Sequence, residues 1–81
     1  VGYPVLISVK PSNSLALGEN VYDKDRNIVG MVGQSNQIYV RVENKKGTLT
    51  VGKDEDSCQI NYSIPEEKED DKLILLSGQC L

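Results

Sequence analysis

Short runs of aliphatic and β-branched residues that alternate with polar residues constrain this chain more than any other feature. The runs lie at residues 5–10, 38–43, 48–51 and 58–64. A side-chain period of two is typical of a β-strand with one face in the core and the other in solvent. No segment combines the 3.6-residue period of a helix with capping residues. The pattern therefore predicts an all-β chain.

Clusters of turn-forming residues separate these runs. They lie at residues 11–14, 24–27, 34–37, 44–47, 53–56 and 65–71. Six turns divide the 81 residues into about seven short strands, and there is no internal repeat or domain boundary. The spacing predicts a single domain over residues 1–81. We expect about seven strands in a mostly antiparallel β-sandwich, Ig-like or transthyretin-like, with one disulfide.

The role of the two cysteines can be inferred from the small size of the core. A chain of 81 residues without Phe or Trp buries only about 60–65% of its unfolded surface. A metal site needs more ligands than Cys58 and Cys80, and the chain has no His. Their wide spacing excludes a redox motif. A disulfide or two buried thiols remain, and the disulfide is favoured because small secreted domains need such a crosslink. It would contribute about 3 kcal/mol and imply an oxidising compartment.

A disulfide also predicts a register for the end of the chain. We place Cys58 opposite Cys80 on adjacent antiparallel strands, because the hydrophobic pattern then agrees with the pairing. The pairs that follow are Ile64 with Ile74, Tyr62 with Leu76, and Ile60 with Gly78. These side chains would face the core. Leu73 and Leu75 would remain on the outer face.

A second hairpin is predicted around Ser35 and Asn36, because Asn tolerates the positive φ of a tight turn. A two-residue loop gives the pairs Gly33 with Ile38, Met31 with Val40, and Val29 with Val42, all facing the core. The other face then carries Ile28, Val32, Tyr39 and Arg41. A three-residue loop would change these pairs.

Charge and hydropathy exclude several classes of function. The net charge is −3 and the basic residues are scattered, so nucleic acid is not an expected partner. The longest apolar run, Leu73–Leu76, is far shorter than the ~20 residues of a membrane helix. Residues 1–20 show no signal-peptide pattern and residue 1 is not Met, so we expect Val1 to begin a mature chain or a fragment.

Nothing in the sequence predicts an enzyme or a cofactor site. The acidic runs at residues 54–56 and 66–71 lack the glycine of a calcium loop and are interpreted as solvated turns. Gly30–Gly33 has no helix or Lys after it, so it indicates a bulge or a close backbone approach, not a phosphate loop. The chain has no His to act as a base. We therefore expect no catalytic, metal or cofactor-binding residue.

Outward apolar residues are the best candidates for a binding surface. Ile28, Val32 and Tyr39, with Arg41 beside them, would form one patch, and Leu73 and Leu75 another. A contiguous exposed apolar patch indicates a protein partner. The alternative is that the fold covers these side chains. Tyr39 is favoured, because Tyr is enriched in interfaces.

Several motifs occur in a characteristic order from about Leu15 to Leu81. Gly30–Gln34 (GMVGQ) and a short turn precede Ile38–Val40 (IYV). Gly47–Gly52 (GTLTVG), Cys58, Tyr62–Pro65 (YSIP) and the nearly terminal Cys80 follow. This order resembles the C-terminal domain of outer-membrane ushers of the chaperone–usher fibre assembly pathway.

The resemblance includes departures. Leu15–Gly18 (LALG) stands where the family has L-P-F-G, so that Ala16 and Leu17 replace Pro and Phe. Val51 stands where many members have Trp, and Asn36 where a turn glycine is common. These differences indicate a divergent member, such as an usher for capsule-like fibres.

The resemblance implies a function. The domain would lie at the periplasmic face of the Gram-negative outer membrane, as part of a larger barrel protein, without itself entering the membrane. It would hold chaperone–subunit complexes during fibre secretion and assembly, next to the barrel and plug of the usher. A free-standing secreted adhesion or ligand-binding sandwich, or a structural spacer, is the alternative.

Overall fold

The fold is a single curled β-sheet. The computed structural model describes residues 2–10, 15–52, 55, 57–66, 69 and 72–81. Its strands are β1 (Tyr3–Val9), β2 (Asn20–Tyr22), β3 (Ile28–Val32), β4 (Gln37–Val42), β5 (Lys46–Val51), β6 (Cys58–Ser63) and β7 (Ile74–Gly78). They form a seven-stranded sheet in the order β6-β5-β2-β3-β4-β1-β7. Among the described strands, β1 and β7 alone pair in parallel. The predicted all-β, mostly antiparallel fold is confirmed.

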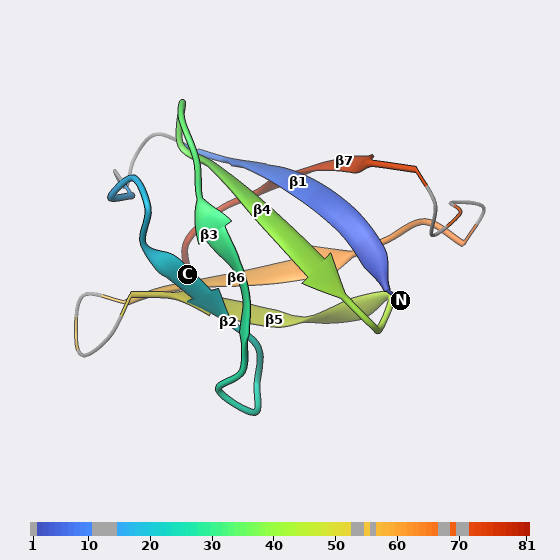
Figure 1. The fold of residues 1–81 in the computed structure, drawn as a ribbon, viewed down its shortest axis with the longest axis horizontal. Coiled ribbons are helices and arrows are strands. Elements are labelled where there is room, and N and C mark those ends of the chain that lie inside the picture. Colours follow the sequence, from blue (N-terminus) through green and yellow to red (C-terminus); the bar gives the residue numbers. More distant parts are fainter. Residues whose placement is uncertain (1, 11–14, 53–54, 56, 67–68, 70–71) are drawn as a thin grey trace.

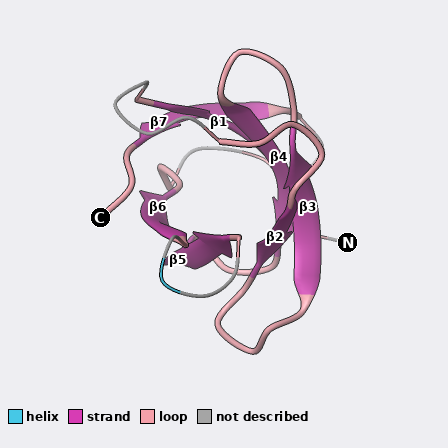
Figure 2. Ribbon diagram, turned by 90° about the vertical axis from the view of Figure 1, so that its left-hand side faces the viewer, coloured by secondary structure: helices cyan, strands magenta, loops and turns pink. Residues whose placement is uncertain are grey.

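The sheet curls until its two ends nearly meet. In Figure 2 the strands are arranged around a ring, with β6 and β7 at the opening. Figure 1 shows β5 and β6 lying across the core from β1, β4 and β7. The two layers expected of a sandwich are therefore two halves of one sheet.

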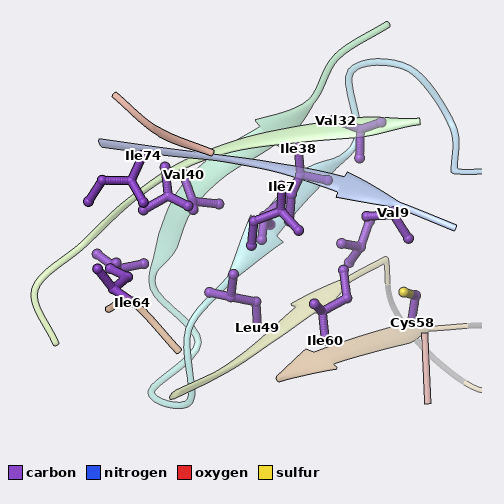
Figure 3. Close-up of a cluster of buried hydrophobic side chains, with 14 residues drawn as sticks. Ile7, Val9, Val32, Ile38, Val40, Leu49, Cys58, Ile60, Ile64 and Ile74 are labelled. Carbon is purple, nitrogen blue, oxygen red and sulfur yellow. The ribbon is translucent and has the colours of Figure 1, made fainter. Parts of the chain in front are cut away.

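The core lies inside this ring and consists almost entirely of Val and Ile. Figure 3 shows the side chains converging from opposite halves of the sheet. The buried set is Val5, Ile7, Val9, Val21, Val32, Ile38, Val40, Val42, Leu49, Val51, Cys58, Ile60, Ile64 and Ile74. Most of them occupy alternate positions of their strands, as the sequence pattern predicts. Packing these alternate residues together is what excludes water from the inside of the curled sheet.

The predicted disulfide is confirmed, but the strand pairing derived from it is wrong. Cys58 and Cys80 are bonded, with their Cα atoms 5.0 Å apart. However, β6 pairs with β5, and β7 pairs in parallel with β1, so β6 and β7 are the two edge strands. The predicted faces survive, because Ile60, Ile64 and Ile74 are buried. The prediction failed because a disulfide can cross the gap between two edges that share no ladder.

The β3–β4 hairpin also differs from the prediction, by one residue of register. Ser35 and Asn36 both have positive φ, 59° and 57°, and the Gln37 N–H donates to the Gln34 carbonyl at 3.2 Å. This is the two-residue turn that the sequence indicates. The Gly33 N–H then also bonds Gln37, at 2.7 Å to its carbonyl. Gly33 and Gln34 are therefore both opposite Gln37, as in a β-bulge.

The bulge decides which side of β3 is buried. Beyond it the pairs are Met31 with Tyr39 and Val32 with Ile38, in place of the predicted Met31 with Val40. Val32, expected on the surface, is only 1% exposed and belongs to the core. Met31, expected in the core, is 51% exposed. A shift of one residue exchanges the two faces of a strand.

Gly30 lies at a close approach between strands, as its place in a strand pattern indicates. The β2–β3 register shifts between Val21 and Tyr22, opposite this part of β3. A Cβ atom at Gly30 would collide with the backbone carbonyl oxygen of Tyr39. Only glycine therefore allows β3 to lie against β4 here.

Candidate interaction surface

An apolar row crosses the outer face of four neighbouring strands. Met31 in β3 pairs with Tyr39 in β4, and Tyr39 pairs with Leu6 in β1. Leu6 in turn pairs with Leu75 in β7. Paired residues of adjacent strands share a face, with their Cβ atoms about 5 Å apart. Met31, Tyr39, Leu6 and Leu75 thus form a continuous line, which we call the apolar row.

The row is open to solvent at both ends and in the middle. Met31 and Tyr39 are each 51% exposed and Leu75 is 68% exposed, while Leu6 is half-buried between its neighbours. The alternation of each strand places these side chains outward, because the residues on either side of them point inward. A contiguous exposed apolar patch of this kind indicates a site of interaction with a protein partner.

Polar groups border the row on one side. The residues next in line toward the β3–β4 turn are Gln37, Ser8 and Ser77, which are paired across β4, β1 and β7. The Gln37 side-chain amide donates to the Ser8 hydroxyl at 3.2 Å. An apolar centre with a polar rim is the usual composition of a protein interface.

Arg41 and Leu73 lie on the other side of the row. Arg41 pairs with Pro4 across β4 and β1, and its Nη1 donates to the Gly2 carbonyl at 3.0 Å. This bond holds the guanidinium against the start of β1. Leu73, just before β7, is 49% exposed. The rim on this side is therefore part apolar and part basic.

The structure joins the two patches that the sequence suggests separately. Tyr39 and Leu75 belong to the same row because Leu6 lies between them. Leu6 was missed, because the parallel pairing of β1 with β7 has no signal in the sequence. Ile28 is 61% exposed at the start of β3, on the same strand as Met31. Of the six predicted surface residues, Val32 alone is excluded by its burial.

Asp23 and Tyr62, which lie near the turn at residues 23–27, have shifted pKa values. The backbone N–H of Asn27 donates to the Asp23 carboxylate at 2.9 Å, and this bond above all lowers the pKa of Asp23. Burial raises the pKa of Tyr62, and the negative charge of Asp23 adds to the rise. The Tyr62 hydroxyl donates to the Asn44 carbonyl at 2.9 Å. Both groups serve local structure.

The described part of the chain contains no helix long and apolar enough to cross a membrane. Within the same residues, no three or more His, Cys, Asp or Glu side chains gather as metal ligands would. The predicted turn at 11–14, and most of the acidic residues at 54–56 and 66–71, lie outside the described residues. The interpretation of those acidic runs as solvated turns stays a prediction.

Comparison with known proteins identifies a group of relatives. The profile of the PapC C-terminal domain family matches residues 7–66. The outer membrane usher protein LpfC of Salmonella typhimurium is 26% identical over 87 residues, which cover 99% of this chain. The chain spans only 10% of the length of LpfC.

Solved structures have the same fold. The Caf1A usher C-terminal domain superposes with a TM-score of 0.77 at 25% identity, covering 95% of this chain and 94% of that one. For the Caf1A domain, conserved hydrophobic clusters on the surface are described as important for F1 antigen assembly. The C-terminal domain of the PapC usher superposes with a TM-score of 0.64 at 23% identity, covering 94% and 98% of the two chains.

Proposed function

The chain belongs to the PapC C-terminal domain family of outer-membrane ushers, and from this premise we propose that it binds chaperone–subunit complexes through the apolar row. It would hold these complexes while the usher secretes and assembles a surface fibre. Its place would be the periplasmic face of the outer membrane, beside the other domains of the usher. Its contribution would be binding energy and positioning, without catalysis.

The apolar row is the observation that carries this proposal. Its four members come from four strands and share no function in the core, because they point away from it. Met31, Tyr39 and Leu75 would each lose water on docking, and burial of apolar area is the main favourable term in association. The importance of surface hydrophobic clusters in the Caf1A domain supports assigning the same kind of role to this surface.

The test is titration calorimetry of the domain with a purified periplasmic chaperone–subunit complex, with free chaperone as the control titrant. We expect saturable binding to the complex. Leu75→Asp should weaken it at least about tenfold, because a charge would enter the apolar centre of the interface. Tyr39→Ala should weaken it by a similar factor through lost contact area.

Ser77→Asp is the matched control. Ser77 lies on the same strand and the same face as Leu75, but among the polar residues that border the apolar row, beside Ser8. The same added charge there should change the affinity by less than about threefold, because a rim charge affects affinity little. Equal losses for Leu75→Asp and Ser77→Asp would show that charge, and not the apolar row, controls binding. Unchanged binding by Leu75→Asp would refute the assignment.

A further inference from the structure

The edge of β5 is only partly covered by its neighbour β2. All six residues of β5 pair with β6, from Lys46 with Ser63 to Val51 with Cys58. On the other side, β2 pairs only with Val51 and Thr50. Figure 1 shows β5 continuing beyond the end of β2. Residues 46–49 therefore form a free edge about 14 Å long.

The free edge presents backbone hydrogen-bonding groups. The Ile64 N–H donates to the Lys45 carbonyl at 2.7 Å, so Lys45 directs its backbone groups toward the β6 side. Backbone groups of successive residues in a strand point to alternate sides. Lys46 and Thr48 therefore direct theirs away from β6, toward the side that β2 leaves open. Both residues are exposed.

Among the described residues, no backbone hydrogen bond joins the turn after β2 to this edge, and the bonds of the turn close within it. The Asp23 N–H donates to the Asn27 carbonyl at 2.9 Å, and the Arg26 N–H to the Asp23 carbonyl at 3.1 Å. The Asp23 carboxylate accepts from the N–H groups of Asp25 and Asn27, both at 2.9 Å. Residues of this turn line the space beside the edge, but β2 does not pair with residues 46–49.

A cavity of about 450 Å³ opens beside the free edge. Its apolar lining consists of Val29, Val42, Leu49 and the ring of Tyr62. The charged residues that line it are equal in number, with Asp23, Asp25 and Glu43 against Lys24, Arg41 and Lys46. The cavity thus suits an apolar side chain of a segment without strong net charge.

We propose that the β5 edge at residues 46–49 binds an extended peptide segment of a partner protein by strand addition. The added strand would lie antiparallel to β5, in line with β2, and bond the backbone groups of Lys46 and Thr48. One of its inward side chains, apolar and uncharged, would enter the cavity. Main-chain bonds supply affinity in this mode, and the pocket supplies specificity. The site is separate from the apolar row and does not depend on the function proposed for it.

The edges of β6 and β7 are less open than this one. β6 and β7 face each other, and the Leu81 N–H donates to the Gln59 carbonyl at 2.9 Å across the gap. The disulfide crosses the same gap. A Cβ atom at Gly78 would lie 2.9 Å from Cγ2 of Ile60, so the two edges touch there. Compared with β6 and β7, the β5 edge is therefore the one with space for an incoming strand.

The test uses a synthetic peptide of about eight residues that alternates Thr and Val, with one Lys and one Glu at its two ends so that it carries no net charge. NMR amide exchange of the domain is measured at about 1 mM peptide, where weak binding is already detectable. We expect the Thr48 amide to exchange at least about tenfold more slowly with the peptide. A second peptide, N-methylated at alternate residues, has the same side chains but cannot complete the ladder, and should give no protection.

Two variants of the domain separate the backbone from the side chain. Thr48→Pro removes the N–H on the free edge, where proline is tolerated, and should abolish binding. Thr48→Val keeps the N–H and should bind as the wild type does. Both variants lose the bond between the Thr48 hydroxyl and Asn61 Oδ1. Binding of the N-methylated peptide, protection confined to β6 or β7, or no protection at all would overturn the proposal.

Discussion

Reduction of the Cys58–Cys80 disulfide should remove a large part of the stability of this domain. The two cysteines are 22 residues apart, and the chain-entropy relation for a loop of this length gives about 11 cal/mol/K. At 25 °C this corresponds to about 3.4 kcal/mol. Domains of this size have a total stability of about 4–12 kcal/mol. The melting temperature should therefore fall by roughly 15–25 °C on reduction.

The measurement is urea unfolding of the oxidised domain and of the same domain with a phosphine reductant, followed by circular dichroism. The double variant Cys58→Ala with Cys80→Ala is the control, because the reductant should not change its midpoint. We expect the reduced wild type and the double variant to unfold at similar, lower urea concentrations. A loss below about 1 kcal/mol would refute the calculation.

The position of the bond makes a second comparison possible. No ladder joins β6 to β7 in the described sheet, so the disulfide is the main link between the two edges. If the bond acts through the unfolded chain, reduction should lower amide protection in β7 and β4 to the same extent. Loss of protection in β7 alone, with an unchanged midpoint, would show that the bond acts as a local tether and that the entropy argument is wrong.

Three further predictions concern single residues. Gly30→Ala should destabilise the domain by about 3 kcal/mol in urea unfolding, because the new Cβ atom would meet a backbone atom of β4. The control is Gly33→Ala, which should destabilise it far less because a Cβ atom there has ordinary contacts. Equal losses of stability for the two variants would contradict this explanation. Ile60→Ala should cost about 3 kcal/mol because Ile60 is fully buried, whereas Leu75→Ala should stay within about 0.5 kcal/mol in the same assay. The pKa of Tyr62 in the folded domain is raised above its ordinary 10.0, so the neutral phenol stabilises the fold below about pH 10, and this contribution is lost as the pH rises through the pKa of the folded state. The free energy of unfolding of Tyr62→Phe should therefore fall less than that of the wild type between about pH 9 and 12. An equal fall would refute this.

The sequence determined the composition of the core to a large extent. In β1, β4, β5 and β6, apolar and polar residues alternate along the sequence of each strand. The buried face of each strand could therefore be predicted without knowing its partners. The exposure of Tyr39 and Leu75 followed from the same alternation. The disulfide was predictable because a thin core without Phe or Trp favours a crosslink and the chain has only two cysteines.

The tertiary structure alone decided which strands are neighbours. Leu6 brings Tyr39 and Leu75 into one row only because β7 crosses over to pair in parallel with β1. The bulge at Gly33 and Gln34 buried Val32 and exposed Met31, although the turn itself was predicted. Residues of one strand interact through local geometry, and a single sequence encodes that geometry. Pairing between strands depends on how the whole sheet curls and closes, which no local pattern records.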